Sequence, residues 1–307
     1  MNSKPHVLVI GGPTASGKTR LAIELAKSLG GEIVSADSRQ IYKYMDIGTA
    51  KATAEERAEA FHHLVDFLEP KENYSAGQFA KDAVAKIKEI LNRGAFPIVC
   101  GGTGLYIEAL TEGLRESEDP DPGIRAFLNN LYAERGKEGL VEYLAERDAQ
   151  ALEMYPDRNP ARLIRALEYC LSTGRKFSEG IGERRKEGDF NFLMFGPDIP
   201  RETLYERINA RAEAMWSGGL IEETERLLAM GVEEGTNALN TVGYKEAVDY
   251  IKGRNNGGDA LEQMKRNTRR YAKRQMTWFR NRGSLTFMSG EGGFILKNIL
   301  GIVKKLI

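Results

Sequence analysis

One glycine-rich segment, at residues 12–19, constrains the possible folds of this chain more than any other feature. It matches the pattern G-x-x-x-x-G-K-[ST] and stands between an apolar run typical of a buried strand and a stretch with helical spacing. In such a loop the backbone wraps around phosphate oxygens, and N–H groups at the helix N-terminus face the anion. We therefore expect a diphosphate-binding P-loop made of Gly12, Pro13, Thr14, Ala15, Ser16, Gly17, Lys18 and Thr19.

The motif alone does not identify its ligand, since ATP, GTP and a prenyl diphosphate all carry two linked phosphates. Lys18 would add a positive charge, and the hydroxyl of Thr19 would ligate a phosphate-bound Mg²⁺. Asp37, which ends the predicted second strand, could hold the metal through water, act as a general base or cap a turn. The polar residues after it could hold a nucleophile-bearing partner against that base: Ser38, Arg39 and Gln40.

The order of predicted elements indicates an α/β fold. Strand–helix–strand units give parallel sheets with right-handed crossovers, and in the simplest topology the second strand lies beside the first. A second glycine-rich turn, at residues 101–104, follows a strand and should face the same crevice as the P-loop. Strands are expected at residues 6–10, 32–36, 64–68, 96–100, 190–195 and 284–288, and helices at residues 75–92, 201–217, 219–230 and 258–282.

The pattern changes near residue 116, where a charged segment with two prolines interrupts it. Residues 121–173 show only helical spacing, and the strand pattern returns near residue 190. We predict an α/β core at residues 1–115 and 189–307, with a parallel sheet flanked by helices. An all-helical insertion domain should occupy residues 116–188.

The charge of the chain is balanced overall but uneven along its length. The formal net charge is zero, yet residues 262–282 contain eight basic residues and one acidic residue. A basic stripe on a neutral protein indicates a specific docking face for a polyanion. No apolar stretch approaches the roughly 18 to 20 residues that span a bilayer, and no signal-peptide pattern is present. We therefore expect a cytoplasmic protein with no membrane contact.

Several segments together resemble the bacterial tRNA dimethylallyltransferases of the IPP transferase family. The resemblance extends in the right order over nearly the whole chain, and it implies a P-loop-kinase-like core with a helical insertion. The matching segments are GPTASGKT (12–19), DSRQIYKYMDIGTAK (37–51), HHLVDFLEPKENYSAGQF (62–79), GGTGLY (101–106), NPARLIRALEY (159–169), GYKEA (243–247) and AKRQMTWFR (272–280).

The resemblance also implies a reaction, in which a dimethylallyl group passes from dimethylallyl diphosphate to N6 of adenosine 37 in the tRNA anticodon loop. The P-loop would bind the diphosphate of the donor rather than ATP, with Mg²⁺ on Thr19. Asp37 would take the proton from the adenine amino group, and Arg211 would bind the diphosphate. The enzyme is expected to act as a monomer. The residues that would contact tRNA are Asp37, Ser38, Arg39, Gln40, Thr103, Arg125, Ala161, Arg162, Leu163, Ile164 and Arg165.

Other interpretations of the residues remain open at this point. Without the resemblance, Arg125, Arg165 and Arg211 are typical of solvated helix faces with ion pairs. A P-loop small-molecule kinase would share the core, but it would not explain the basic stripe. An isopentenyltransferase of free adenine nucleotides would not need the insertion, and a nucleotide-switched RNA-binding protein would not need a general base.

Overall fold

The computed structural model describes residues 4–115, 121–179, 184–283 and 285–306. The chain forms two compact units, one of residues 1–111 with 186–307 and the other of residues 112–185. The sequence predicts boundaries three or four residues later, at 115/116 and 188/189. The division falls earlier because strands β5 (Leu114–Arg115) and β6 (Arg184–Arg185) pair with each other in antiparallel fashion, as part of the second unit.

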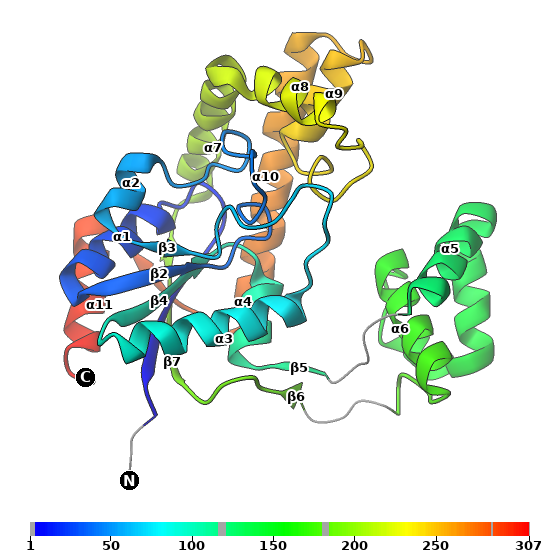
Figure 1. Cartoon of the computed structure of the whole chain (residues 1–307), viewed down its shortest axis with the longest axis horizontal. Helices are drawn as coiled ribbons and strands as arrows, with labels where there is room; N and C mark the ends of the chain where they lie inside the picture. Colours follow the sequence, from blue (N-terminus) through cyan, green and yellow to red (C-terminus); the bar gives the residue numbers. More distant parts are fainter. Residues whose placement is uncertain (1–3, 116–120, 180–183, 284, 307) are drawn as a thin grey trace. The chain divides into compact units, whose positions relative to one another are not determined.

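The first unit is built around a six-stranded sheet in which every neighbouring pair is parallel (Figure 1). The strand order is β3-β2-β4-β1-β7-β8. The predicted α/β class with a parallel sheet is therefore confirmed. The strands are β1 (His6–Gly11), β2 (Gly31–Ser35), β3 (His62–His63), β4 (Phe96–Gly101), β7 (Asn191–Asp198) and β8 (Thr286–Ser289).

Two details of the predicted sheet are wrong. Strand β4 lies between β1 and β2, so the second strand does not pair with the P-loop strand. The third strand is His62–His63 rather than residues 64–68. Leu64 and Asp66 have φ values of 57° and 59°, so the chain turns where an extended strand was expected. Leu68 forms only an isolated bridge with Tyr42.

Helices cover both faces of the sheet, and alternate residues of β1 point to opposite sides. Val7 and Val9 pack with helices α3 (Ala76–Asn92) and α4 (Gly104–Thr111). Leu8 and Ile10 pack with α1 (Lys18–Leu29) and α11 (Gly292–Val303). All four β1 side chains are fully buried. The P-loop strand is thus held in the centre of two apolar layers.

A group of helices beyond the carboxyl end of the sheet forms a third core (Figure 1). The members of this group are α7 (Arg201–Met215), α8 (Ile221–Ala229), α9 (Tyr244–Ile251) and α10 (Gly257–Arg282). A π-helical turn at Trp216–Leu220, with Gly219 at φ 108°, joins α7 to α8. Helices α4 and α9 were not expected from the sequence, nor was the short α2 (Ala54–Glu59).

The second unit is helical apart from the pair β5 and β6. Helix α5 (Pro122–Glu153) is interrupted at Gly136 and Asp148, where the backbone leaves helical geometry. Helix α6 (Pro160–Thr173) packs against it around a leucine-rich core. Asp121 and Asn159 cap the two helices, each accepting two backbone N–H groups.

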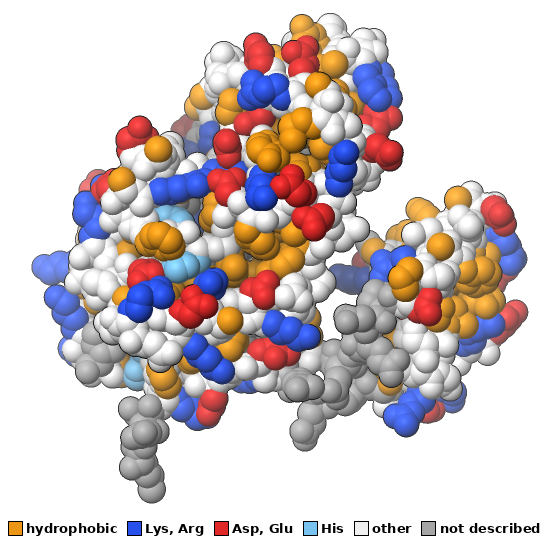
Figure 2. All heavy atoms as spheres, viewed as in Figure 1, with side chains coloured by type: hydrophobic (Ala, Val, Ile, Leu, Met, Phe, Trp, Pro, Cys, Tyr) orange, Lys and Arg blue, Asp and Glu red, His pale blue; other side chains and the backbone are white. Residues whose placement is uncertain are grey.

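Charged side chains of both signs are interspersed on the face drawn in Figure 2. This mixture agrees with the formal net charge of zero. Among the described residues, no helix combines the length and apolar character that a membrane crossing requires.

Candidate active site

The P-loop connects β1 to the first turn of α1. Gly17 precedes the helix with φ 83° and provides no side-chain cap, which leaves the helix N-terminus open toward the loop. The side chain of Lys18 folds back, and its Nζ donates to the carbonyl oxygen of Pro13 at 3.2 Å. Burial lowers the pKa of Lys18, and the carboxylate of Asp37 acts in the opposite direction. The lysine is therefore held beside the loop, where a bound anion would stabilise its charged form.

The two glycine-rich turns meet, as predicted, and a glutamine joins them. Gln275 of α10 accepts from the backbone N–H of Thr14 through Oε1 at 2.9 Å. Its Nε2 donates to the carbonyl oxygen of Gly102, also at 2.9 Å. A Cβ atom at residue 102 would lie 2.4 Å from that Nε2, so the close approach requires glycine there.

Asp37 lies just past the end of β2, in a tight network with the second turn. Its Oδ1 accepts from the backbone N–H of Arg39 at 2.9 Å. The backbone N–H of Ser38 donates to Oγ1 of Thr103 at 2.9 Å, and that hydroxyl donates to Oγ of Ser38 at 3.2 Å. The backbone N–H of Thr103 in turn donates to the carbonyl of Ala36 at 3.1 Å. The carboxylate is therefore held by the backbone of Arg39, and the neighbouring Ser38 is held by Thr103 beyond the end of β4.

Arg211 extends from α7 to the P-loop. Its Nη2 donates to the hydroxyl of Thr14. Burial lowers the pKa of the guanidinium, while the nearby carboxylate of Asp37 favours its charged form. A cavity of about 200 Å³ is lined by Thr14, Asp37, Arg39 and Arg211, together with parts of α10 and of two loops. Four residues predicted separately for the site therefore share one cavity.

The loop at residues 46–50, which forms one wall of this cavity, is held from two sides. Glu223 of α8 is 2% exposed, and its carboxylate accepts the backbone N–H groups of residues 46, 47 and 48 at 3.0 to 3.2 Å. The hydroxyl of Tyr244 donates to the same carboxylate at 2.5 Å. On the other side, Nε2 of Gln40 donates to the carbonyls of Thr49 and Ala50 at 3.3 and 3.0 Å. The Gln40 amide, predicted to contact tRNA, is thus engaged in holding this wall.

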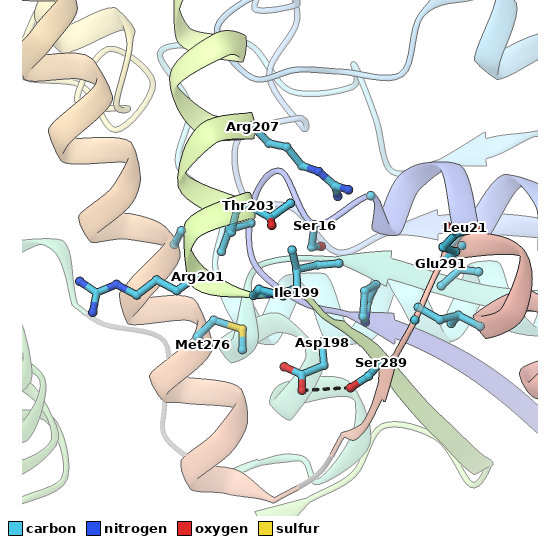
Figure 3. A pocket seen from close by; sticks show the side chains of 18 of the residues that line it. Ser16, Leu21, Asp198, Ile199, Arg201, Thr203, Arg207, Met276, Ser289 and Glu291 are labelled. Carbon is cyan, nitrogen blue, oxygen red and sulfur yellow. Dashed lines mark hydrogen bonds between the residues drawn. The ribbon is translucent and has the colours of Figure 1, made fainter.

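A second and larger cavity, of about 1340 Å³, lies against the other side of the P-loop (Figure 3). Ser16 and Gly17 line it, whereas Thr14 lines the first cavity. The hydroxyl of Ser16 is buried and has no hydrogen-bond partner among the described residues. Arg207 of α7, one helical turn before Arg211, also lines the larger cavity. This cavity was not foreseen, because its walls come from chain segments distant in sequence.

Helix α10 exposes part of the predicted basic stripe. Arg270, Lys273 and Arg274 are exposed and form no ion pair among the described residues. Lys265, by contrast, pairs with Glu213 and Glu262 at 2.7 Å each. The stripe is thus divided between structural ion pairs and an accessible positive face.

The residues predicted to bind tRNA from the second unit have more varied surroundings. Arg125 is paired with the buried carboxylate of Glu168, its Nη2 lying 2.6 Å from Oε2, and Arg165 lies 3.5 Å from the same oxygen. The side chains of Leu163 and Ile164 are packed in the core of the unit, so a contact of these two residues with tRNA would have to involve their backbone. The accessible members of the predicted segment are Ala161 and Arg162, with Arg165 half-buried.

The parallel sheet, the P-loop and the carboxylate beside it define an α/β protein of the P-loop class. The family model described as IPP transferase matches residues 40–282, and one described as isopentenyl transferase matches residues 5–67. The chain belongs to the IPP transferase family.

Relatives and solved structures agree with this assignment. The chain is 48% identical to the tRNA dimethylallyltransferase of Acetivibrio thermocellus, over 90% of this chain and 88% of the relative. It is similar in structure to the tRNA delta(2)-isopentenylpyrophosphate transferase of Staphylococcus epidermidis, with a TM-score of 0.72 and 38% identity over 99% and 100% of the two chains. A eukaryotic dimethylallyltransferase that acts on tRNA gives a TM-score of 0.80 with 26% identity, over 93% of this chain and 74% of that one.

Proposed function

We propose that this protein transfers a dimethylallyl group from dimethylallyl diphosphate to N6 of adenosine 37 in the tRNA anticodon loop, releasing diphosphate. The observation that carries the proposal is the shared cavity of Thr14, Asp37 and Arg211, which combines diphosphate-binding groups with a proton acceptor. The names of the relatives support tRNA as acceptor and a dimethylallyl donor. We further propose that the protein is cytoplasmic and acts as a monomer.

The donor side of the reaction depends on charge neutralisation. As N6 attacks C1 of the prenyl group, the bond from C1 to the diphosphate oxygen breaks, and the electron pair leaves with diphosphate. Backbone N–H groups of the P-loop, with Lys18 and Arg211, oppose the charge that grows on this leaving group. Both side chains are partly shielded from solvent, where such interactions are stronger than in water.

The residues present are compatible with Mg²⁺ bound mainly by the donor. Thr19 is the second residue of α1, and no hydrogen bond among the described residues uses its hydroxyl. The described part of the chain contains no cluster of three or more acidic, histidine or cysteine side chains that could hold a metal by itself. Mg²⁺ commonly binds substrate phosphates with few protein ligands, and it would reduce the negative charge of the diphosphate. Thr19 would then be its protein ligand.

The acceptor side requires a base, because the lone pair of the adenine amino group is delocalised into the ring. One oxygen of Asp37 accepts from the backbone, which orients the carboxylate so that its other oxygen can accept the N6 proton. The adenosine has to leave its stack to enter the cavity, at a cost of a few kcal/mol. Contacts of the RNA backbone with Arg270, Lys273 and Arg274 on α10 would offset this cost. Ser38, Arg39 and Thr103 would contact the nucleotide, and the second unit would contact the anticodon stem-loop.

A transfer assay with three acceptors distinguishes this proposal from its rivals. The protein is incubated with labelled dimethylallyl diphosphate and either unmodified tRNA, a tRNA with guanosine at position 37, or free AMP. We expect label in the first tRNA alone, and mass spectrometry should locate the prenyl group on adenosine 37. Label in AMP instead would identify an enzyme of free nucleotides. Phosphate transfer from ATP to a metabolite, without prenyl transfer, would identify a kinase.

A further inference from the structure

Gln275 occupies the junction between the two halves of the cavity. Its side chain is 7% exposed, and its two hydrogen bonds reach residues 261 and 173 positions away in sequence. One bond fixes the N–H of Thr14, whose hydroxyl accepts from Arg211. The other fixes the carbonyl of Gly102, the residue before Thr103. The leaving-group side and the base side are therefore attached to the same amide.

The contacts form a nearly continuous hydrogen-bonded path across the site. From Arg211 the path runs through Thr14 and Gln275 to Gly102, and the next residue, Thr103, holds the backbone of Ser38 beside Asp37. A primary amide suits the junction because it offers one acceptor and one donor on a planar group. A carboxylate of equal size would place an acceptor against the carbonyl of Gly102, and a thioether would supply neither bond.

We propose that Gln275 is a positioning residue that sets the distance between the diphosphate site and the general base. This inference rests on the proposed function. Gln275 touches neither proton nor leaving group in this role, and it acts by holding the two turns in register. Reactions of this type are sensitive to such spacing, since a displacement of about 1 Å can cost about 10²-fold in rate.

The test compares Gln275→Met and Gln275→Glu with a matched control on the same helix. Gln263 is half-exposed, lines neither cavity, and its Oε1 accepts from Arg266, so Gln263→Met makes the same chemical change elsewhere on α10. For both Gln275 variants we expect kcat to fall about 10- to 100-fold while KM for tRNA changes less than about threefold. The control should retain wild-type kcat. Circular dichroism melting and the fraction of active molecules, from a single-turnover burst, correct for loss of folded protein.

A second experiment tests the geometry directly through Gly102. A methyl group at residue 102 would lie 2.4 Å from Nε2 of Gln275, so Gly102→Ala should displace the amide. In a Gln275→Ala background that conflict is removed. We expect Gly102→Ala to reduce kcat at least about fivefold in the wild type and less than about twofold in the Gln275→Ala protein. Such a difference is the non-additivity expected of two residues in contact.

The outcomes separate the inference from the proposed function. If the wild-type protein prenylates no tRNA, the proposed function fails, whatever the variants do. If the wild type is active and Gln275→Met matches Gln263→Met in kcat, the positioning role is wrong. A rise in KM for tRNA with unchanged kcat would also overturn it, and would assign Gln275 to RNA binding. If Gln275→Met does not fold, the kcat of Gln275→Glu decides by the same criteria. The comparison of Gly102→Ala in the wild-type and Gln275→Ala backgrounds provides a second decision.

Discussion

The two cavities beside the P-loop differ in size and in the polar groups of the P-loop that face them. In the smaller one, many polar groups are already engaged with the protein: Arg211 with Thr14, Gln275 with both turns, and Gln40 with the wall loop. In the larger one, the buried hydroxyl of Ser16 has no partner among the described residues. The difference indicates that the smaller cavity is pre-organised for chemistry. The larger cavity has more room and offers the free hydroxyl of Ser16, although Asp198 in its lining is engaged with Arg280 and Ser289.

The largest effect should come from the carboxylate of the smaller cavity. Asp37→Ala should lower prenyl transfer at least about 10²-fold, because the adenine amino group loses its proton acceptor. Asp198→Ala, at the edge of the larger cavity, is the matched change and should cost much less. Steady-state assays on tRNA measure both. Equal losses of prenyl transfer in the two variants would show that the two cavities do not differ in their contribution to catalysis.

Arg211 and Arg207 offer a second comparison, one helical turn apart on α7. Arg211→Met should reduce kcat about 10²-fold, since it removes a partly buried positive charge that faces the departing diphosphate. Arg207 faces the larger cavity, so Arg207→Met should mainly raise KM for the donor. Rapid-quench measurements separate the two effects. A loss of kcat with Arg207→Met would show that the larger cavity also contributes to the chemical step.

A third prediction concerns the rigid wall of the smaller cavity. Glu223→Ala leaves three backbone N–H groups and the hydroxyl of Tyr244 without their acceptor, so the free energy of unfolding should fall by about 2 kcal/mol. Glu222→Ala, the exposed neighbour, is the control and should change it by less than about 0.5 kcal/mol. Urea titrations followed by fluorescence give both values. Equal stability of the two variants would show that the wall does not depend on this carboxylate.

The smallest effect is a proton linkage at the P-loop itself. Burial lowers the pKa of Lys18 below the usual lysine value of about 10.4, and a bound diphosphate should raise it again. At pH values between the pKa of Lys18 in the free protein and its pKa in the complex, binding takes up a fraction of one proton. In the same window the free protein gains stability as pH rises, because the unfolded chain binds more protons than the folded one.

Calorimetry of diphosphate binding in buffers with different ionisation enthalpies measures this uptake. Lys18→Arg is the control, since a guanidinium stays charged at these pH values and should show no uptake. Equal binding enthalpies for the wild type in all buffers would contradict the linkage.

Local patterns in the sequence were sufficient for the P-loop, the strand before it and the helix after it. The same holds for Asp37 at the end of a strand, because each of these depends on residues close in sequence. The position of β4 was not predictable in this way, since the choice of strand neighbours depends on distant segments. Nor were the roles of Glu223 and Gln275, which act through backbone groups more than 170 positions away. A polar residue on an amphipathic helix looks the same in sequence whether it faces solvent or a buried turn.

The place of β4 in the sheet has a consequence for the size of the transferred group. Neighbouring strands are about 4.8 Å apart, so interposing one strand separates the ends of β1 and β2 by about 10 Å. The strand ends that lead into the P-loop and into Asp37 are therefore two strand spacings apart. If β2 paired directly with β1, the ends of the two strands would be only about 4.8 Å apart, and the dimethylallyl group would have half the space. The strand order thus sets the spacing between the two strand ends that is available to the substrate.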